Sequence, residues 1–200
     1  MHQSANMVLN QITDELNLFL LIFKFLFMKV LFSIKSILLM CVMLVILCSC
    51  NTTTYYLVRH GEKLNNSDTS SLSGDGWDRA YALRDTLLND EINYIFVSDK
   101  KRTQQTATPL ATAISKNFEI FSLTNAGTQS LITRLKSYNG QSRILVVGHT
   151  STIPKIIDSL MKSPQHVVIP EDSFNRMYVV RIIHQNPVRR TLTVLRYGRR

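Results

Sequence analysis

Short apolar runs alternate with amphipathic stretches along residues 51–200. Each run holds three to seven residues rich in Val, Ile, Leu, Phe and Tyr, which is typical of strands buried on both faces. Turn-forming residues bound the runs, and Gln185-Asn186-Pro187 marks a turn between the last two. The strands expected from this pattern are 54–59, 92–97, 118–121, 143–147, 167–169, 177–183 and 192–196.

Four stretches between these runs carry apolar residues at helical spacing. Ser73 and Thr150 are suitable N-caps for the first and the last of them. We expect Pro109 to kink the second helix or to lie in a restarted first turn, whereas Pro154 falls in a first turn and is tolerated. The apolar faces are Ala80, Leu83, Leu87 and Leu88; Ala107, Leu110, Ala111 and Ile114; part of 130–138; and Ile153, Ile156, Ile157, Leu160 and Met161.

Alternating strands and helices predict the fold class. Such an order gives an α/β domain, a mostly parallel sheet with helices on both faces, here with a late antiparallel hairpin at one side. A ligand in such a sheet is expected at the carboxyl ends of the strands. We therefore divide the chain into an N-terminal extension with a signal segment, residues 1–50, and one domain, residues 51–200.

The N-terminal segment has the three parts of an export signal within residues 28–50. Lys29 and Lys35 form a basic start, and an apolar run follows over 37–48, which is short for a membrane span. The sequence Leu47-Cys48-Ser49-Cys50 resembles a bacterial lipobox. We expect export and lipid anchoring through Cys50 to a bacterial membrane, on its periplasmic or cell-surface side.

Three alternatives for this segment stay open. The apolar stretch from Leu16 onward could serve as a single uncleaved membrane anchor if its lysines reach the interface. It could also be a buried hydrophobic arm. Translation could start at Met28 rather than Met1, because a second apolar patch at 18–23 precedes an already complete signal.

Charge and cysteine usage exclude several function classes. The chain holds 23 Lys and Arg against 14 Asp and Glu, and residues 51–200 keep 20 and 12 of these. A basic domain suits nucleic acid, anionic lipid or phosphorylated substrates. No basic run interleaved with aromatics and no zinc-finger spacing occurs, so we expect no nucleic-acid partner. All cysteines precede position 51, which excludes internal disulfides, cysteine metal sites and thiol nucleophiles from the domain.

Three polar segments directly follow expected strands. They are Arg59-His60-Gly61-Glu62, the ten residues 98–107, and Gly148-His149-Thr150. Parallel strands bring their carboxyl ends to one edge, so two imidazoles and the guanidiniums of Arg59 and Arg102 should converge there.

This set of side chains suits a phosphoryl group. A guanidinium presents a rigid fork of donors that matches phosphate oxygens, and a neutral imidazole can attack phosphorus. Clustered positive charge stabilises the equatorial oxygens of the transition state. We expect neither metal nor other cofactor, because two arginines and a second histidine supply the charge.

The three segments, in this order, resemble the histidine phosphatase superfamily, also called phosphoglycerate mutase-like. The family opens with R-H-G and continues with a segment like Leu72-Ser73…Gly76…Arg79-Ala80. Then come S-x-x-x-R-T-x-Q-T-A at 98–107 and G-H at 148–149. The resemblance implies His60 as nucleophile, Arg59 and Arg102 as phosphate ligands, and His149 as a donor to phosphate. By position, Glu62 would orient the pocket, and Gly61 and Thr150 would contact substrate. The lack of large insertions resembles small bacterial phosphohistidine phosphatases, which implies a phosphorylated small molecule or phosphoprotein as partner.

The sequence departs from the family where many relatives carry a general acid. Residues 122–130 contain no carboxylate, and Thr150 follows His149 where one branch has Asp. Glu62, Asp75 or a water molecule remain candidates for protonating the leaving group. We therefore expect phosphomonoester or phosphoramidate hydrolysis through phospho-His60. A binding module without turnover is the main alternative, and a phosphoglycerate mutase is a weaker one.

Overall fold

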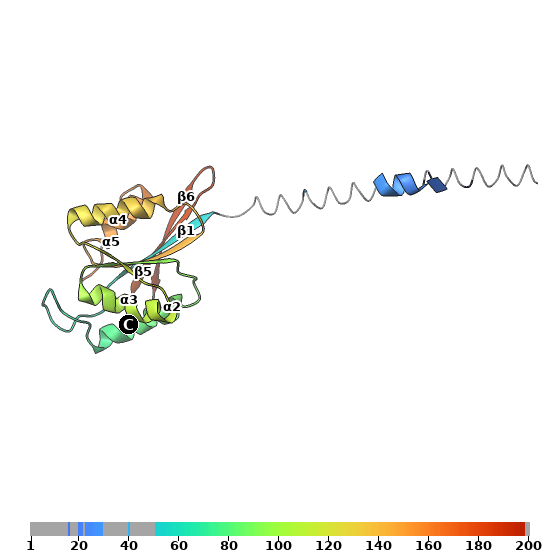
Figure 1. Cartoon of the computed structure of the whole chain (residues 1–200). Coiled ribbons are helices and arrows are strands. Elements are labelled where there is room, and N and C mark those ends of the chain that lie inside the picture. Colours follow the sequence, from blue (N-terminus) through green and yellow to red (C-terminus); the bar gives the residue numbers. More distant parts are fainter. Residues whose placement is uncertain (1–15, 17–19, 22, 30–39, 41–50, 199–200) are drawn as a thin grey trace, which may run out of the picture. The chain divides into compact units, whose positions relative to one another are not determined.

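The computed structural model describes residues 16, 20–21, 23–29, 40 and 51–198 (Figure 1). The chain divides into two units, residues 1–49 and 50–200. The signal segment falls almost entirely outside the described residues, and so does Cys50. Among the residues described, no helix combines the length and the apolar character needed to cross a membrane.

A six-stranded sheet forms the centre of the domain. Its strands follow the spatial order β3-β2-β4-β1-β5-β6, in which the first four are parallel. β5 runs antiparallel to β1, and β6 runs antiparallel to β5, so the hairpin lies at one side as expected. The strands are β1 (Thr52–Arg59), β2 (Tyr94–Ser98), β3 (Glu119–Phe121), β4 (Ser142–Gly148), β5 (Arg176–Ile183) and β6 (Arg189–Arg196).

Two pairs of helices cover the two faces of this sheet (Figure 1). Alternation along β1 shows why, since Tyr55 and Leu57 belong to one core cluster while Tyr56 and Val58 belong to the other. The first cluster packs under α4 and α5, and the second under α2 and α3. The helices are α2 (Gly74–Leu87), α3 (Lys101–Ala113), α4 (Asn125–Ser137) and α5 (Ile153–Met161).

Capping side chains fix where two of the helices begin. The hydroxyl of Ser73 accepts a hydrogen bond from the Gly76 amide at 3.1 Å, which confirms Ser73 as the cap of α2. Thr124 caps α4 in the same way through the Gly127 amide. α4 therefore begins at Asn125, five residues before the expected start, because the polar stretch before Ser130 forms the first turns of the helix.

The expected cap at Thr150 and the expected strand at 167–169 are both wrong. α5 begins at Ile153 with Thr152 as its N-cap residue, because the turn from His149 to Thr152 comes first. Within 167–169, Ile169 is buried in the core while Val168 is 77% exposed, and the segment pairs with no described strand. Burial of one side chain from a loop produced the apolar pattern there.

Two details of the expected helices also differ. Leu88 ends α2 as its C-cap residue and is 43% exposed, so it does not extend the buried face of that helix. α3 runs from Lys101 to Ala113 through a buried Pro109, and no new helix begins at that residue.

Candidate active site

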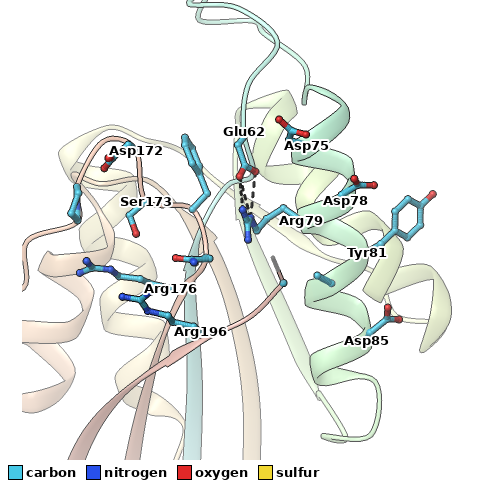
Figure 2. A pocket seen from close by; sticks show the side chains of 15 residues that line it. Glu62, Asp75, Asp78, Arg79, Tyr81, Asp85, Asp172, Ser173, Arg176 and Arg196 are labelled. Carbon is cyan, nitrogen blue, oxygen red and sulfur yellow. Dashed lines mark hydrogen bonds and ion pairs between the residues drawn. The ribbon is translucent and has the colours of Figure 1, made fainter. Parts of the chain in front are cut away.

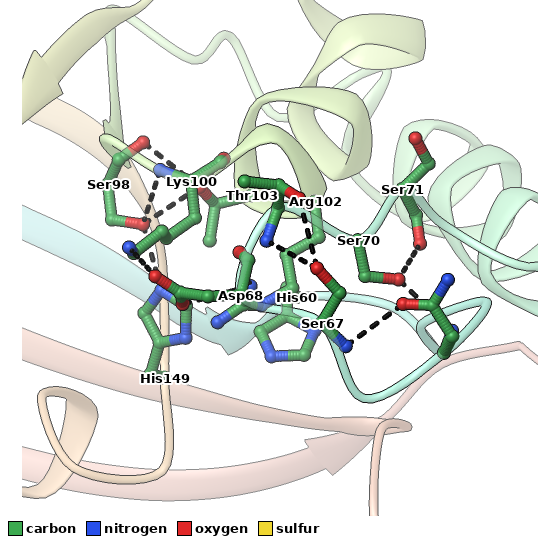
Figure 3. Close-up of polar contacts among 12 residues, drawn as sticks. His60, Ser67, Asp68, Ser70, Ser71, Ser98, Lys100, Arg102, Thr103 and His149 are labelled. Atoms are coloured by element: carbon green, nitrogen blue, oxygen red, sulfur yellow. Dashed lines mark hydrogen bonds and ion pairs between the residues drawn. The ribbon is translucent and has the colours of Figure 1, made fainter.

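The strand order brings all three sequence segments to one edge of the sheet. β4 lies between β2 and β1, and Arg59 is paired with Gly148 in the register of β1 and β4. The His60 amide continues this ladder by donating to the Gly148 carbonyl oxygen at 3.1 Å. The rings of His60 and His149 consequently lie edge to face, with centroids 5.0 Å apart (Figure 3).

His60 is held as a neutral imidazole with a defined tautomer. Its Nδ1 lies 2.7 Å from the carbonyl oxygen of Gly61, which can only accept, so Nδ1 carries the proton. Nε2 then keeps its lone pair. Burial lowers the pKa of His60 to about 4, against the raising effect of the Gly61 carbonyl, and the charges of Arg102 and Arg59 lower it further.

His149 is oriented by a chain of hydroxyl groups that starts on α3. The Thr103 hydroxyl donates to the Lys100 carbonyl oxygen at 2.6 Å and so accepts from the Ser98 hydroxyl at 2.9 Å. Ser98 Oγ then accepts from Nε2 of His149 at 2.8 Å, which leaves Nδ1 for other partners. Burial, followed by His60 and the two arginines, lowers the pKa of His149 to about 3.

Arg59 is buried and is fixed by the loop that precedes β5. Its guanidinium donates to the carbonyl oxygens of Pro170 and Glu171, and Nη2 pairs with the Glu171 carboxylate at 2.9 Å. The guanidinium carbon lies 4.2 Å from the ring centroid of Phe174, whose ring also faces His60 at 6.0 Å. Nε of Arg59 has no partner among the described residues.

Arg102 approaches the site from the start of α3. Its Nη1 donates to the backbone oxygen of Asp68 at 2.8 Å, and its buried Nε has no partner in the part of the chain described. Lys100 forms an ion pair with the carboxylate of the same aspartate (Figure 3). The hydrogen bond from Lys100, helped by the charges of Lys100, Arg102 and His149, lowers the pKa of Asp68.

The remaining polar residues of the 98–107 motif tie neighbouring loops together. Thr106 Oγ1 accepts from the Gly61 amide at 2.9 Å, and Gln105 Oε1 accepts from the Leu72 amide at 2.9 Å. Gly61 itself packs against α2, because a Cβ there would lie 2.7 Å from the carbonyl oxygen of Gly76. The motif therefore fixes the backbone directly after the candidate nucleophile.

Glu62, Thr150 and Asp75 lie away from the imidazole pair. The Glu62 carboxylate pairs with Arg79 of α2 at 2.6 Å and lines a cavity that also contains Asp75 (Figure 2). Thr150 donates to the Glu171 carboxylate at 3.4 Å. The structure gives Glu62 and Asp75 no contact with either histidine, and a role in proton transfer stays a prediction for both.

Several residues at the site escaped the sequence analysis. Asp68 and Glu171 are the carboxylates at the arginines, Phe174 covers Arg59, and Lys100 forms an ion pair with Asp68. Asp68, Glu171 and Phe174 lie in loops outside the motifs. Only the loop conformation brings them in, and no periodic or spacing signal marks them.

The arrangement forms a buried, positively charged site around the uncharged imidazole of His60. Arg59, Arg102 and Lys100 supply positive charge, and two buried Nε donors have no partner among the described groups. A tetrahedral oxyanion could accept from these donors while its central atom faces Nε2 of His60. Glu171 and Asp68 currently bind the outer donors, so an incoming dianion would compete with two exposed carboxylates.

Comparisons with known proteins agree with this geometry. Residues 55–123 match the family model of the histidine phosphatase superfamily, branch 1. No curated protein sequence matches the chain.

Solved structures share the fold at low sequence identity. A mycobacterial glucosyl-3-phosphoglycerate phosphatase is 15% identical with a TM-score of 0.59, covering 72% of this chain and 99% of its own. The protein histidine phosphatase SixA, solved with tungstate, is 18% identical with a TM-score of 0.51, covering 72% and 96%. A phosphoserine phosphatase from Entamoeba histolytica is 14% identical with a TM-score of 0.52, covering 74% and 98%. The sequence resemblance is thereby confirmed over the matched segment: residues 55–123 carry the signature of the histidine phosphatase superfamily, branch 1, and the domain has the phosphoglycerate mutase-like fold.

Proposed function

We propose that the protein hydrolyses phosphomonoesters or phosphoramidates through a phosphohistidine on His60. The observation that carries this proposal is the hydrogen bond from His60 Nδ1 to the Gly61 carbonyl oxygen. It directs a lone pair on Nε2 toward a site where Arg59 and Arg102 each keep an unpaired buried Nε among the described residues. Binding alone would not require a nucleophile with a fixed tautomer.

The reaction has two displacements at phosphorus. In the first, Nε2 of His60 forms the N–P bond while the P–O or P–N bond to the leaving group breaks. In the second, water attacks phosphorus, the N–P bond breaks, and phosphate leaves with His60 regenerated. The attacking water loses one proton to solvent, and this proton balances the one that the leaving group takes up from solvent. Arg59 and Arg102 stabilise the charge on the equatorial oxygens in both steps.

His149 couples phosphate binding to proton uptake. Its Nε2 proton is bonded to Ser98, so Nδ1 donates to a phosphate oxygen only when the ring carries a second proton. Burial and nearby cations lower its pKa to about 3, and an arriving dianion opposes both effects. We therefore expect the substrate to bring its own proton to the site or to draw one from water.

The leaving group receives little help from the protein. Lys100 and Arg59 hold the two carboxylates at the site, Asp68 and Glu171, in ion pairs, and the hydrogen bond from Lys100 lowers the pKa of Asp68. An ionised carboxylate can accept a proton from the attacking water but cannot donate one. Phosphoramidates and aryl phosphates should accordingly be better substrates than alkyl phosphates.

The first test uses the full chain, purified in detergent, with p-nitrophenyl phosphate and a chelator present. We expect turnover that His60→Ala abolishes and that His166→Asn retains, since His166 is exposed and its φ of 51° suits asparagine. Acid quenching should trap a phosphoryl group on the peptide that contains His60. A folded protein that binds vanadate without turnover would refute the phosphatase and favour the binding module.

A second test compares leaving groups. Rates for an aryl phosphate, a phosphoramidate and an alkyl phosphate should fall steeply in the order of rising leaving-group basicity. An equally fast alkyl phosphate would show that an efficient acid operates. Asp68→Asn and Glu171→Gln would then identify it, because only the variant of the donor would lose the alkyl substrate selectively.

We also propose that the protein is lipid-anchored through Cys50. The support is the order of basic start, apolar run and Leu47-Cys48-Ser49-Cys50 in the sequence. Cells fed a fatty-acid analogue should label the wild type and the Cys48→Ser variant, and the Cys50→Ser variant should stay unlabelled. Equal labelling of both variants would refute the assignment.

A further inference from the structure

The cavity that contains Glu62 and Asp75 has no role in the chemistry above. It has a volume of about 1100 Å³ and lies between α2 and the strands β5 and β6 (Figure 2). Phe174 and Pro170 belong to its lining and also contact Arg59, so the cavity shares a wall with the phosphate site. Its size suits a small organic molecule.

One wall of this cavity carries two arginines that face each other across the hairpin. Arg176 of β5 and Arg196 of β6 are directly opposite in the strand register, and both line the cavity. Like charges in opposite positions of neighbouring strands destabilise a sheet. Neither guanidinium has an ion pair with any carboxylate of the described chain, although Asp172 lines the same cavity.

The α2 side of the cavity is acidic, because Asp75, Asp78 and Asp85 lie along that helix beside the Glu62–Arg79 ion pair (Figure 2). The side chains of Arg176 and Arg196 point away from α2 (Figure 2), on the face of the sheet where Tyr178 packs. An anion is attracted to the hairpin on that face and repelled from α2.

We propose that this arginine pair binds a second anionic group, phosphate or carboxylate, of a small phosphorylated substrate. The inference rests on the proposed phosphatase function of His60. β5 is the neighbour of β1, and β6 is the next strand out, so the pair lies within about 10 Å of the strand that ends at Arg59. A substrate with two anionic ends separated by roughly this distance would occupy both sites.

The test measures binding apart from turnover. Calorimetry on the full chain carrying His60→Ala compares the bisphosphate of hexane-1,6-diol with its monophosphate. We expect the bisphosphate to bind about tenfold more tightly, and Arg176→Met with Arg196→Met to remove that preference. The matched control is Arg181→Met with Arg189→Met, which removes the same charge from the far end of the same strands.

The outcomes separate this inference from the phosphatase. Equal affinities for the two ligands, or a preference that survives the Arg176 and Arg196 substitutions, would overturn the second site. A preference lost equally in the control pair would also overturn it, by showing only the effect of net charge. Hydrolysis of p-nitrophenyl phosphate by the wild type is measured separately, so missing turnover of that substrate contradicts only the role of His60.

Stability gives an independent readout for the arginine pair. Because Arg176 and Arg196 repel each other, Arg196→Met alone should raise the melting temperature while it weakens bisphosphate binding. A variant that melts lower would indicate that the pair stabilises the hairpin, which contradicts a binding role. The control variant Arg189→Met should change neither the melting temperature nor the affinity for the bisphosphate.

Discussion

Gly61 offers a sharp test of how the backbone holds the candidate nucleophile. In the Gly61→Ala variant the new Cβ would lie 2.7 Å from the carbonyl oxygen of Gly76 and 3.1 Å from its Cα. Both neighbours are backbone atoms, so either β1 or the start of α2 must move by roughly half an ångström to restore contact distances. That shift also strains the hydrogen bond from the Gly61 amide to Thr106.

The size of the effect follows from this geometry. Overpacking at a rigid contact costs about 1–3 kcal/mol, and a weakened buried hydrogen bond adds to it. For a domain of this size, about 2 kcal/mol corresponds to a melting temperature lower by about 4–8 °C. His60 is the preceding residue, and we expect kcat to fall at least about tenfold, because attack on phosphorus requires close alignment.

The assay uses the only tryptophan of the chain. Trp77 lies on α2 next to Gly76, so its fluorescence reports on the packing that the substitution disturbs. The control is Gly140→Ala, whose Cβ would meet none of the described atoms within 4 Å, and its effect should stay within about 0.5 kcal/mol. Equal melting temperatures and equal kcat for the two variants would refute the reasoning.

Three further predictions concern the same site. Ser98→Ala leaves the buried Nε2 proton of His149 without its acceptor, so we expect the free energy of unfolding to fall by about 1–3 kcal/mol and kcat to decrease. Thr108→Ala, at an exposed position, should change neither quantity. An unchanged kcat in Ser98→Ala would argue against the hydroxyl chain. Burial lowers the pKa of His60 to about 4 and that of His149 to about 3, so the unfolded chain binds more protons than the folded protein below about pH 6.5. The melting temperature should therefore fall as the pH drops from about 6.5 toward 4. His60→Ala and His149→Ala should each reduce this dependence on pH. Glu62→Gln breaks the ion pair with Arg79 of α2 and should lower the melting temperature, with less than about a threefold change in kcat for p-nitrophenyl phosphate. A larger decrease in kcat would support Glu62 as the general acid.

The sequence determined the elements and the main chemistry because both are local properties. Alternating apolar runs and helical faces reflect the two core clusters, and β1 shows this directly, since Tyr55 and Tyr56 enter opposite clusters. The Arg59-His60 and Gly148-His149 motifs follow strands that must end at one edge. Parallel pairing of β1 and β4 then suffices to bring the two imidazoles together.

Tertiary structure alone decided which charges meet. Asp68 and Glu171 reach the site from loops whose conformations depend on contacts with Lys100 and Arg59, far away in the chain. Glu62 follows the candidate nucleophile closely in sequence, yet its side chain forms an ion pair with Arg79 of α2, which is distant in the chain. A linear pattern contains no information about such partners.

The hairpin register is the clearest case of what the sequence left open. Arg176 and Arg196 are unremarkable residues at two strand ends, and a shift of the register by one position would separate them. The register follows from how Tyr178 and Val180 pack into the core, which is a property of the assembled sheet. Local patterns and motifs therefore predicted the strands, the helices and the candidate nucleophile, whereas long-range packing decided which charged side chains surround it.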